Sequence, residues 1–289
     1  MISNMEKSKI ARNFDLASRT YNEVAVLQRV ISERLIERLG FIRLKPERVL
    51  DIGSGTGMAV KQLKKMYRHC RIVLLDISAQ MLRQAKKSQP WLSSGHHYLQ
   101  ADAEILPLSD NSIDLVFSNL TLQWCTQPDR VFNEVMRTLK PGGHLIFSTF
   151  GPSTLTELKQ CWAQVDNYTH INSFVDMHDL GDAMTHCGLE DIVMEMEIFT
   201  MTYENGMGLM RDLQKLGARN INPGRQKGLT GKGKLNSVLT NYEAFRRDGR
   251  LPASFEVIYG HAWKAEKAKP QMTRGDTAYV SVDSLKRRA

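Results

Sequence analysis

Hydrophobic residues in the first half of the chain gather in short, almost wholly apolar runs that alternate with amphipathic segments. Runs rich in Val, Ile and Leu predict strands near residues 49–52, 71–76, 97–101 and 113–118. Apolar residues three or four positions apart predict helices at 58–67, 79–87 and 128–139. Strands and helices that alternate in this way predict a parallel sheet covered on both faces, a doubly wound α/β fold.

The remaining segments are predicted to extend and surround this sheet. Apolar positions at helical spacing predict one helix over residues 10–39, ahead of the first strand. Further strands are predicted at 144–150, 191–203 and 255–263, and further helices at 154–165 and 177–187. A long insertion, residues 204–252, separates the last two strands and contains a predicted helix at 206–217, so we expect it to form a lid.

Three glycines at alternate positions follow the first predicted strand, in the run Val49–Gly57 (VLDIGSGTG), with Asp51 just ahead of them. Glycine tolerates positive φ and the next helix offers free N–H groups, so such a loop can approach a bound ligand closely. The Gly-x-Gly-x-Gly spacing differs from the Gly-x-Gly-x-x-Gly of dinucleotide folds. The loop indicates a nucleotide-like ligand, although some structural turns have a similar pattern.

Polar residues stand at the ends of the other three early strands. The second strand ends in Asp76, about 20 residues beyond the glycines, where a carboxylate that accepts both ribose hydroxyls is expected. The third is followed by Asp102-Ala103-Glu104 and the fourth by Asn119-Leu120. Because open parallel sheets bind ligands beyond the carboxyl ends of their strands, we expect these groups to line one site.

These motifs resemble, position by position, those of the Rossmann-like S-adenosylmethionine-dependent methyltransferases, over roughly residues 45–150. The resemblance also includes Leu139–Gly143, which looks like the turn before the fifth strand. It implies a seven-stranded methyltransferase sheet and S-adenosylmethionine as cofactor. It further implies a set of cofactor-binding residues: Asp51, Gly53, Ser54, Gly55, Gly57, Asp76, Ile77, Met81, Asp102, Ala103, Glu104, Asn119 and Leu120.

Composition narrows the possible partners and settings. The formal net charge is +8, which favours acidic partners, but no motif for nucleic-acid binding is present. There is no 18-residue apolar run and no signal-peptide core at the start, so we expect no membrane span and a cytoplasmic location. The four cysteines are far apart and the histidines do not share a helical face, so we expect reduced thiols and no metal site.

A second resemblance spans nearly the whole chain through residue 263. The segments Asn13–Tyr21, Ser118–Trp124 and Met210–Ala218 look like those of the malonyl-[acyl-carrier protein] O-methyltransferases of biotin synthesis. This implies methyl transfer to the free carboxylate of a malonyl thioester on an acidic acyl-carrier protein, which starts pimeloyl synthesis. The implied units are an entry segment, a cofactor-binding core, an inserted lid, a last core strand and a polar tail: 1–44, 45–203, 204–252, 253–265 and 266–289.

Four residues in the outer segments are candidates for the acceptor side of the site. Arg211 could bind the substrate carboxylate through two parallel hydrogen bonds, and Tyr21 could close over the methyl donor. Gln123 and Trp124 would shape the acceptor wall. Each has a simpler structural explanation: a helix arginine is commonly solvated, Tyr21 falls on an apolar stripe, and Trp124 could serve packing alone.

The sequence fits two other functions as well. A methyltransferase acting on another small carboxylate or a quinone precursor would have the same cofactor loop. A methyltransferase-like assembly factor of respiratory complex I, associated with protein arginine hydroxylation, has some resemblance to the tail around 278–282, which could form an edge strand or stay mobile. A glycine-rich stretch with Arg225, Lys227, Lys232 and Lys234 is expected to be a basic loop, either solvated or used for docking. The oligomeric state is not predicted.

Overall fold

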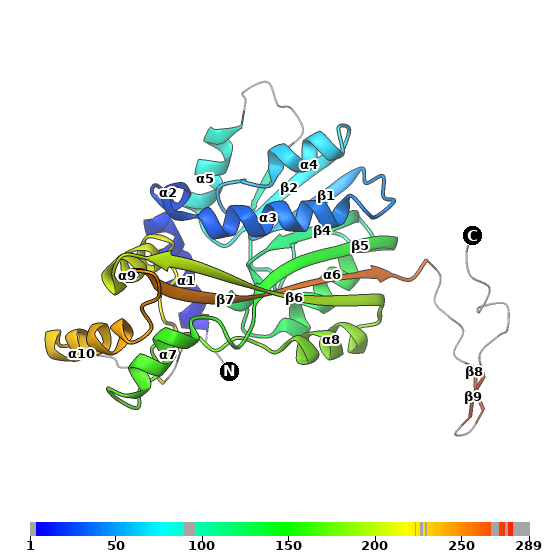
Figure 1. Ribbon diagram of the computed structural model, residues 1–289. Helices are drawn as coiled ribbons and strands as arrows, with labels where there is room; N and C mark the ends of the chain where they lie inside the picture. The colour runs from blue at the N-terminus through cyan, green and yellow to red at the C-terminus, as the bar shows by residue number, and fades with distance from the viewer. Residues whose placement is uncertain are drawn as a thin grey trace.

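The computed structural model describes residues 4–89, 96–222, 224–225, 228 and 230–266, together with the backbone of 272–274 and 277–279. Its centre is a seven-stranded sheet with the order β3-β2-β1-β4-β5-β7-β6 (Figure 1). The strands are β1 Arg48–Ile52, β2 Arg71–Asp76, β3 His96–Gln100, β4 Ile113–Asn119, β5 Leu139–Phe150, β6 Leu189–Tyr203 and β7 Leu251–Lys264. The first five are parallel, and β7 runs antiparallel to both β5 and β6. The predicted doubly wound sheet is confirmed.

Helices cover both faces of this sheet. They are α1 Asn4–Ala17, α2 Tyr21–Val24, α3 Val26–Leu39, α4 Val60–Met66, α5 Ala79–Ser88, α6 Pro128–Thr138, α7 Thr156–Ala163, α8 Met177–His186, α9 Gly206–Lys215 and α10 Lys232–Glu243. One hydrophobic cluster joins the sheet to α3, α4 and α5, and the other joins it to α6 and α8. Each fully buried aliphatic side chain, such as Leu35 at 0% exposure, contributes roughly 1.5–3 kcal/mol to folding.

The single helix predicted over residues 10–39 is wrong. The chain forms three helices there, with breaks at residues 18–20 and at Ala25. The hydroxyls of Ser18 and Thr20 donate to the backbone carbonyls of Asp15 and Ala17, which gives the backbone an alternative to continued helix. The breaks turn the chain, so that Tyr21 and the start of α3 lie over the carboxyl edge of the sheet.

Two predicted loops also differ from the structure. Leu139–Gly143, expected as a turn, is part of β5, but its register with β4 jumps from Ile113↔Leu139 to Leu115↔His144. The residues between form a bulge in which Gly142 has φ +74°. The basic glycine-rich stretch is shorter than expected because α10 begins at Lys232. Lys227 lies outside the described residues. So does most of the tail, apart from two short strands, β8 Met272–Arg274 and β9 Thr277–Tyr279, which pair with each other.

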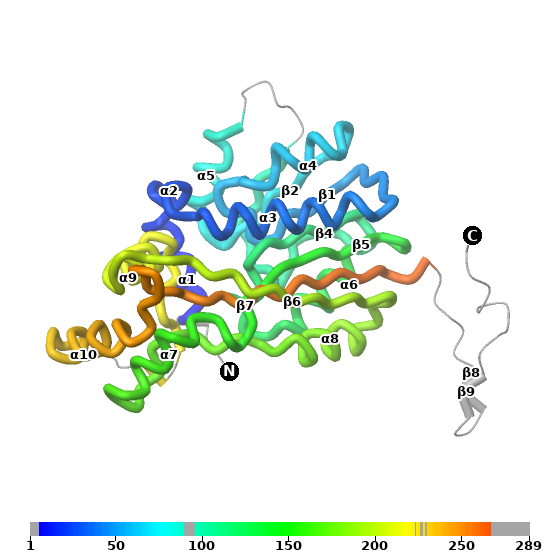
Figure 2. Tube along the Cα trace, in the orientation of Figure 1, coloured from blue at the N-terminus to red at the C-terminus, as the bar shows by residue number. Residues whose placement is uncertain are grey.

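The inserted stretch between β6 and β7 contains α9 and α10 and meets the N-terminal helices at one end of the sheet (Figure 2). Gly217, just after α9, has φ +74° and lies so close to α1 that an added Cβ would be 3.2 Å from the Asn13 carbonyl oxygen. Only glycine satisfies both the backbone conformation and this close approach. The entry segment and the inserted lid therefore touch each other.

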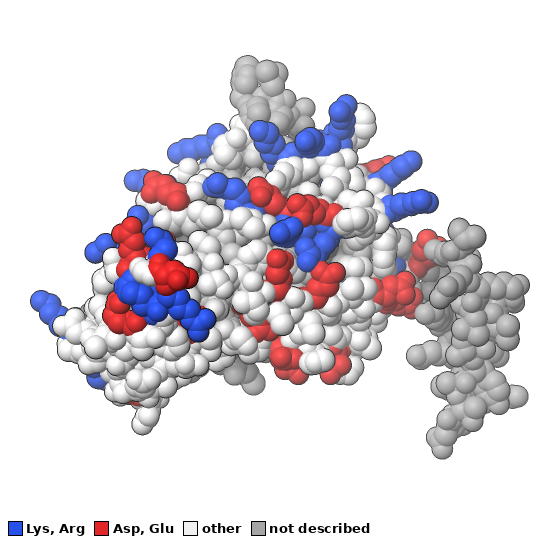
Figure 3. Space-filling view, viewed as in Figure 1, with Lys and Arg blue, Asp and Glu red and all other residues white. Residues whose placement is uncertain are grey.

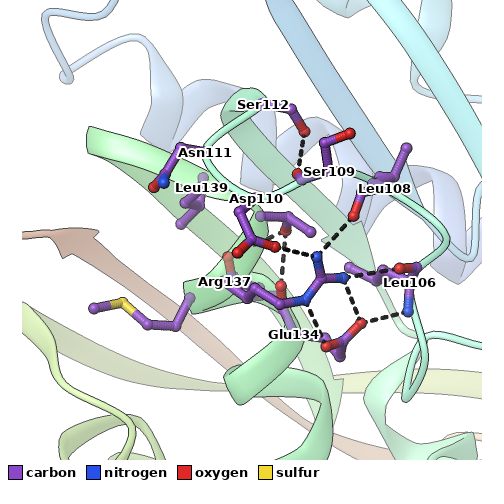
Figure 4. Close-up of polar contacts among 12 residues, drawn as sticks. Leu106, Leu108, Ser109, Asp110, Asn111, Ser112, Glu134, Arg137 and Leu139 are labelled. Atoms are coloured by element: carbon purple, nitrogen blue, oxygen red, sulfur yellow. Dashed lines mark hydrogen bonds and ion pairs between the residues drawn. The ribbon is translucent and has the colours of Figure 1, made fainter.

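Arg137 at the end of α6 fixes the segment between β3 and β4 (Figure 4). Its guanidinium donates to the carbonyls of Leu106 and Leu108 at 2.8 and 2.7 Å and forms ion pairs with Glu134 and Asp110. Glu134 in turn accepts the Leu106 N–H at 2.6 Å. Three of the five N–H donors of this planar group therefore hold the segment that follows Asp102–Glu104, and the other two bind Glu134.

His144 on β5 is a buried histidine without hydrogen bonds. It is 0% exposed, neither ring nitrogen has a partner in the described part of the chain, and its ring lies 4.3 Å from that of Trp263. Burial, with a smaller effect of the nearby His261, lowers the pKa of His144 to about 3. The folded protein therefore contains a neutral imidazole where an unfolded chain would titrate near 6.5.

We expect this histidine to destabilise the protein in mild acid. As pH falls below about 6.5, His144 binds a proton in the unfolded chain, whereas in the folded protein it stays neutral until about pH 3. The free energy of unfolding therefore falls by up to ~1.4 kcal/mol per pH unit. Urea denaturation between pH 7.5 and 5 measures the slope. His144→Phe keeps an aromatic ring against Trp263 and should show a shallower slope; equal slopes in the two proteins would contradict the assignment.

Candidate active site

A cavity lies beyond the carboxyl ends of β1, β2, β3 and β4, as expected for an open parallel sheet. We call it the cofactor cavity. It brings together most of the cofactor-binding residues predicted from the sequence. Those that line it are Gly53, Gly55, Asp76, Ile77, Met81, Asp102, Ala103, Asn119 and Leu120. Of the predicted acceptor residues, Tyr21, Gln123 and Trp124 line the same cavity.

The glycine loop has the backbone conformation that its sequence predicts. Gly53, Gly55 and Gly57 have φ of +68°, +53° and +76°, a region that residues with a Cβ rarely adopt. A Cβ on Gly53 would be 2.0 Å from the Thr121 hydroxyl, whereas a Cβ on Gly55 would meet no atom within 4 Å. Gly53 is therefore required by packing inside the protein, while Gly55 faces open space where a ligand can lie.

Asp76 at the end of β2 ties this loop to α5. Its carboxylate accepts the N–H of Gly55 at 2.9 Å and that of Ser78 at 2.8 Å, one on each oxygen. Ser78 caps α5 by accepting the Met81 N–H at 3.1 Å, and its hydroxyl donates to Asp15 of α1. Each Asp76 oxygen keeps a further lone pair, so the side chain can still accept hydroxyl groups from a ribose.

A small polar pocket adjoins the cofactor cavity at the glycine loop, with Tyr21, Gln28, Gly53, Gly55 and Asn119 shared between the two. Its walls carry four buried polar oxygens that have no hydrogen-bond partner among the described residues. They belong to Gln28, Ser32, Asp51 and Ser54. An unsatisfied buried oxygen costs about 1–3 kcal/mol, so a cluster of four indicates a place for a polar ligand.

Gln28 and Ser32 were not predicted from the sequence. Both come from α3, whose buried face is otherwise formed by residues such as Leu27, Ile31 and Leu35. Two polar residues four positions apart share one helical face, so their place beside an apolar stripe was a detectable signal. The prediction of an apolar entry helix overlooked it.

Burial changes the acid–base properties of the two strand-end carboxyls. Burial, reinforced by the charge of Asp76, raises the pKa of Asp51 to about 8. Burial also raises the pKa of Asp76, to about 6, although the N–H groups of Ser78 and Gly55 oppose the shift. Two acids this close and this buried disfavour each other's ionisation, and a positive ligand group would reverse that penalty.

The opposite end of the cofactor cavity is acidic, and a single ammonium group pairs with two carboxylates there. Lys7 of α1 forms ion pairs with Asp102 and, at 2.8 Å, with Glu104. Glu104 is 7% exposed and also accepts both the N–H and the hydroxyl of Thr126, and these partners lower its pKa. Glu104 is therefore fixed within the protein, while Asp102 remains on the cavity wall.

The middle of the cavity is shaped by the residues after β4. The Asn119 side chain accepts the Ser148 hydroxyl and donates to the backbone carbonyl of Gln28. The next residue, Leu120, has φ +52°. A left-handed leucine is uncommon and is held here by N–H donation to Ser148. Gln123 is held by bonds to Leu120 and Thr149.

Aromatic side chains close this region. The rings of Phe14 and Trp124 meet edge to face at 5.2 Å, which joins α1 to the segment after β4. Tyr21 lines both the cavity and the small polar pocket. Burial and the charge of Asp76 raise the pKa of its hydroxyl, so Tyr21 stays protonated at neutral pH and can act only as a neutral donor or acceptor.

The structure does not bring Arg211 to the site. Leu209 of α9 is buried, whereas Arg211, two residues further along the helix, is exposed and lines neither the cofactor cavity nor the small polar pocket. A two-residue step turns about 200° around a helix, so the face that carries Arg211 points away from the core. The predicted carboxylate-binding role of Arg211 therefore has no support from this geometry.

Within the described ranges, no group of three or more His, Cys, Asp or Glu residues could hold a metal ion. The four cysteines are free thiols. No helix in the described part of the chain is long and apolar enough to cross a membrane.

The site defines the class of protein. A glycine loop after β1, an acid at the end of β2 and a polar wall after β3 and β4, on a sheet with an antiparallel last strand, are those of an S-adenosylmethionine-dependent methyltransferase. The family model described as a methyltransferase domain matches residues 50–147. The structure also resembles the YcgJ protein of Bacillus subtilis, with a TM-score of 0.56 and 16% identity, over 82% of this chain and 98% of that one.

Sequence similarity narrows the class to one family. The chain is 45% identical to the malonyl-[acyl-carrier protein] O-methyltransferase of Methylovorus sp. (strain MP688), over 91% of this chain and 90% of the relative. It is 44% identical to the enzyme of the same name from Gallionella capsiferriformans (strain ES-2), over 96% of each. The chain belongs to the malonyl-[acyl-carrier protein] O-methyltransferase family.

The residues present fit S-adenosylmethionine, the cofactor of this class. The unpartnered oxygens of Asp51 and Gln28 suit its ammonium group, and the hydroxyls of Ser32 and Ser54 suit its carboxylate. Asp76 would hold the ribose hydroxyls and Asp102 the adenine, with Ile77 and Met81 beside it. We propose these roles, together with those of Gly53, Gly55, Ala103, Asn119 and Leu120 as the wall of the site. Gly57, also predicted as a cofactor-binding residue, lines neither cavity and packs against Ala85 and Leu74.

We predict that binding of the cofactor depends on the ionisation of Asp51. A pKa of about 8 leaves most of the protein with a neutral Asp51 at pH 7, and the ligand's ammonium group favours the ionised form. Affinity should therefore rise between pH 6.5 and 8, by at most about tenfold per pH unit, with release of a proton. Calorimetric titrations in buffers of different ionisation heat measure both quantities.

Asp51→Asn provides the matched control, because it keeps the shape of the side chain but cannot titrate. It should bind the cofactor more weakly and with little dependence on pH in this range. Equal affinity of the wild-type protein at pH 6.5 and pH 8 would contradict the assignment.

Proposed function

We propose that this chain transfers the methyl group of S-adenosylmethionine to the free carboxylate of a malonyl thioester on an acyl-carrier protein, giving the methyl ester that starts pimeloyl synthesis for biotin. The observation that carries this proposal is a second cavity that joins the cofactor cavity. Gln123, Trp124, Phe150 and Ala218 line both. A methyl donor in one cavity and an acyl group in the other would meet at Gln123 and Trp124.

The chemistry of a carboxylate acceptor suits the side chains at this junction. When bound, S-adenosylmethionine supplies a methyl group made electrophilic by its sulfonium. A malonyl carboxylate, with a reference pKa of roughly 4, is already ionised at neutral pH and attacks through an oxygen lone pair without a general base. The carbon–sulfur bond breaks with its electrons left on sulfur, so the sulfonium and the carboxylate charges cancel and no proton moves.

The protein's contribution is then alignment and the exclusion of water. Trp124 and Phe14 would cover the reacting groups, and the neutral hydroxyl of Tyr21 and the amide of Gln123 would orient them. Holding two reactants in line at about 3–3.5 Å contributes several kcal/mol to lowering a barrier. Residues 1–44 and 204–252, whose helices meet beside the cavity, would act as the lids of a core formed by 45–203 and 253–265.

We also propose an acidic carrier protein as the partner, in the cytoplasm, with no nucleic acid or membrane involved. The formal net charge of +8 supports an acidic partner. Figure 3 shows that charge is unevenly spread on one face, with Lys and Arg gathered over α4 and Asp and Glu over α8. A carrier that docks by charge would be steered to the basic side, and its encounter rate would fall with added salt.

The direct test is methyl transfer from labelled S-adenosylmethionine to malonyl-carrier protein. We expect a base-labile methyl ester with malonyl-carrier protein and slower transfer with malonyl-coenzyme A. Tyr21→Phe, which removes only the hydroxyl, should lower the rate by roughly 10-fold or more if the hydroxyl orients the reacting groups.

The other outcomes separate the alternative functions. Transfer to free small carboxylates or quinone precursors, but not to the carrier-bound malonyl group, would indicate a different acceptor. Cofactor binding without transfer to any of these acceptors would favour a methyltransferase-like assembly factor and would overturn the proposed function.

A further inference from the structure

The second cavity is lined mainly by apolar and aromatic side chains. Its walls include Leu158, Trp162, Phe174, Met210, Leu213 and Phe255. These come from α7, α9, β7 and the segment before α8, so the cavity is closed on one side by the inserted lid. Such walls suit an uncharged acyl chain and do not by themselves hold a carboxylate.

Charged side chains near this cavity are almost all paired. His170 lines the cavity and stacks on Trp162 at 3.5 Å, but its Nε2 lies 2.7 Å from Asp166. Asp166 also binds Lys234 at 2.8 Å, and both partners lower its pKa. These three groups therefore satisfy one another, with Asp166 as the shared partner of the other two.

Arg219 is the exception. It is the only Lys or Arg among the described residues that line the second cavity. Its side chain is exposed, and its guanidinium makes no hydrogen bond or ion pair within the described ranges. Ala218, its neighbour, lines both cavities, so Arg219 lies beside their junction.

The backbone that carries Arg219 is unusually well fixed for a loop. Asn172 accepts the Ile221 N–H at 3.0 Å and its amide donates to the Arg219 carbonyl at 3.4 Å. Asn220 donates to the Thr169 carbonyl, and Asn222 donates to that of Ile171 at 3.0 Å. Three asparagines thus hold the segment after α9 directly to the segment before α8, and they engage the backbone on both sides of Arg219 but not its side chain.

We propose that the second cavity is the acyl-acceptor site and that Arg219 binds the free carboxylate of the acceptor. This role of Arg219 rests on the proposed function and names the residue that would hold the acceptor's carboxylate. A guanidinium can donate two parallel hydrogen bonds to a carboxylate and leave one oxygen lone pair for attack. The aromatic walls would hold the uncharged remainder of the acyl chain, so the site selects chains that end in an anion.

The test compares Arg219→Gln with Arg211→Gln, a matched control on the exposed face of α9. We expect Arg219→Gln to lower kcat/KM for malonyl-carrier protein roughly 10- to 100-fold, and Arg211→Gln to change it less than about twofold. Both variants should keep the wild-type affinity for S-adenosylhomocysteine, which shows on the same samples that the fold and the cofactor site are intact. Arg219→Lys should recover part of the loss.

A second measurement identifies what Arg219 binds. Acetyl-carrier protein has the same thioester-bearing arm as malonyl-carrier protein but no free carboxylate. Its inhibition constant should therefore be the same for wild type and Arg219→Gln. A parallel rise in this constant would mean that Arg219 contacts the arm or the carrier protein, and would overturn the proposal, as would full activity of Arg219→Gln. Absence of transfer by the wild-type protein would instead refute the proposed function itself.

Discussion

The structure of the site depends on the burial of two carboxyl groups, those of Asp51 and Asp76, at the carboxyl edge of the sheet. Burial disfavours the ionised form of each and so raises both pKa values. The protein stabilises Asp76 with N–H groups from the glycine loop and from the start of α5. It leaves an oxygen of Asp51 without a partner. A positively charged ligand would therefore offset the cost of ionising the buried Asp51. Binding gains more from this relief than from adding a contact to a group that already has its partners.

The N-terminal helices supply the other half of this arrangement. Lys7 forms ion pairs with both acids at one end of the cavity, Asp15 accepts hydrogen bonds from the start of α5, and Asn22 accepts the Thr56 hydroxyl beside the glycine loop. Each contact links a residue of the entry segment to a loop that the sheet positions. The segment therefore forms part of the cofactor site and does not simply cover it, and its order is coupled to the same groups that bind the ligand.

The sequence predicted the sheet and the cofactor loop because both depend on local chemistry. Alternate glycines, an acid at the end of a strand and an apolar run of about five residues can all be read directly in the sequence, and the structure confirms the positive φ of the glycines. The breaks in the N-terminal helix were missed because Ser18 and Thr20 interrupt it through backbone bonds that an apolar period does not record. Gln28 and Ser32 were missed since a search for apolar stripes ignores polar residues within them.

The acceptor side was less predictable because it depends on long-range contacts. Arg211 and Arg219 are eight residues apart, and nothing in their local sequence distinguishes a solvated arginine from one beside a cavity. The distinction comes from Asn172, almost 50 residues earlier in the chain, which bonds the segment after α9. A nucleophile that needs no base must be selected by position and charge. The residue that selects it can therefore lie on any segment that the fold brings near, provided that the segment is rigid.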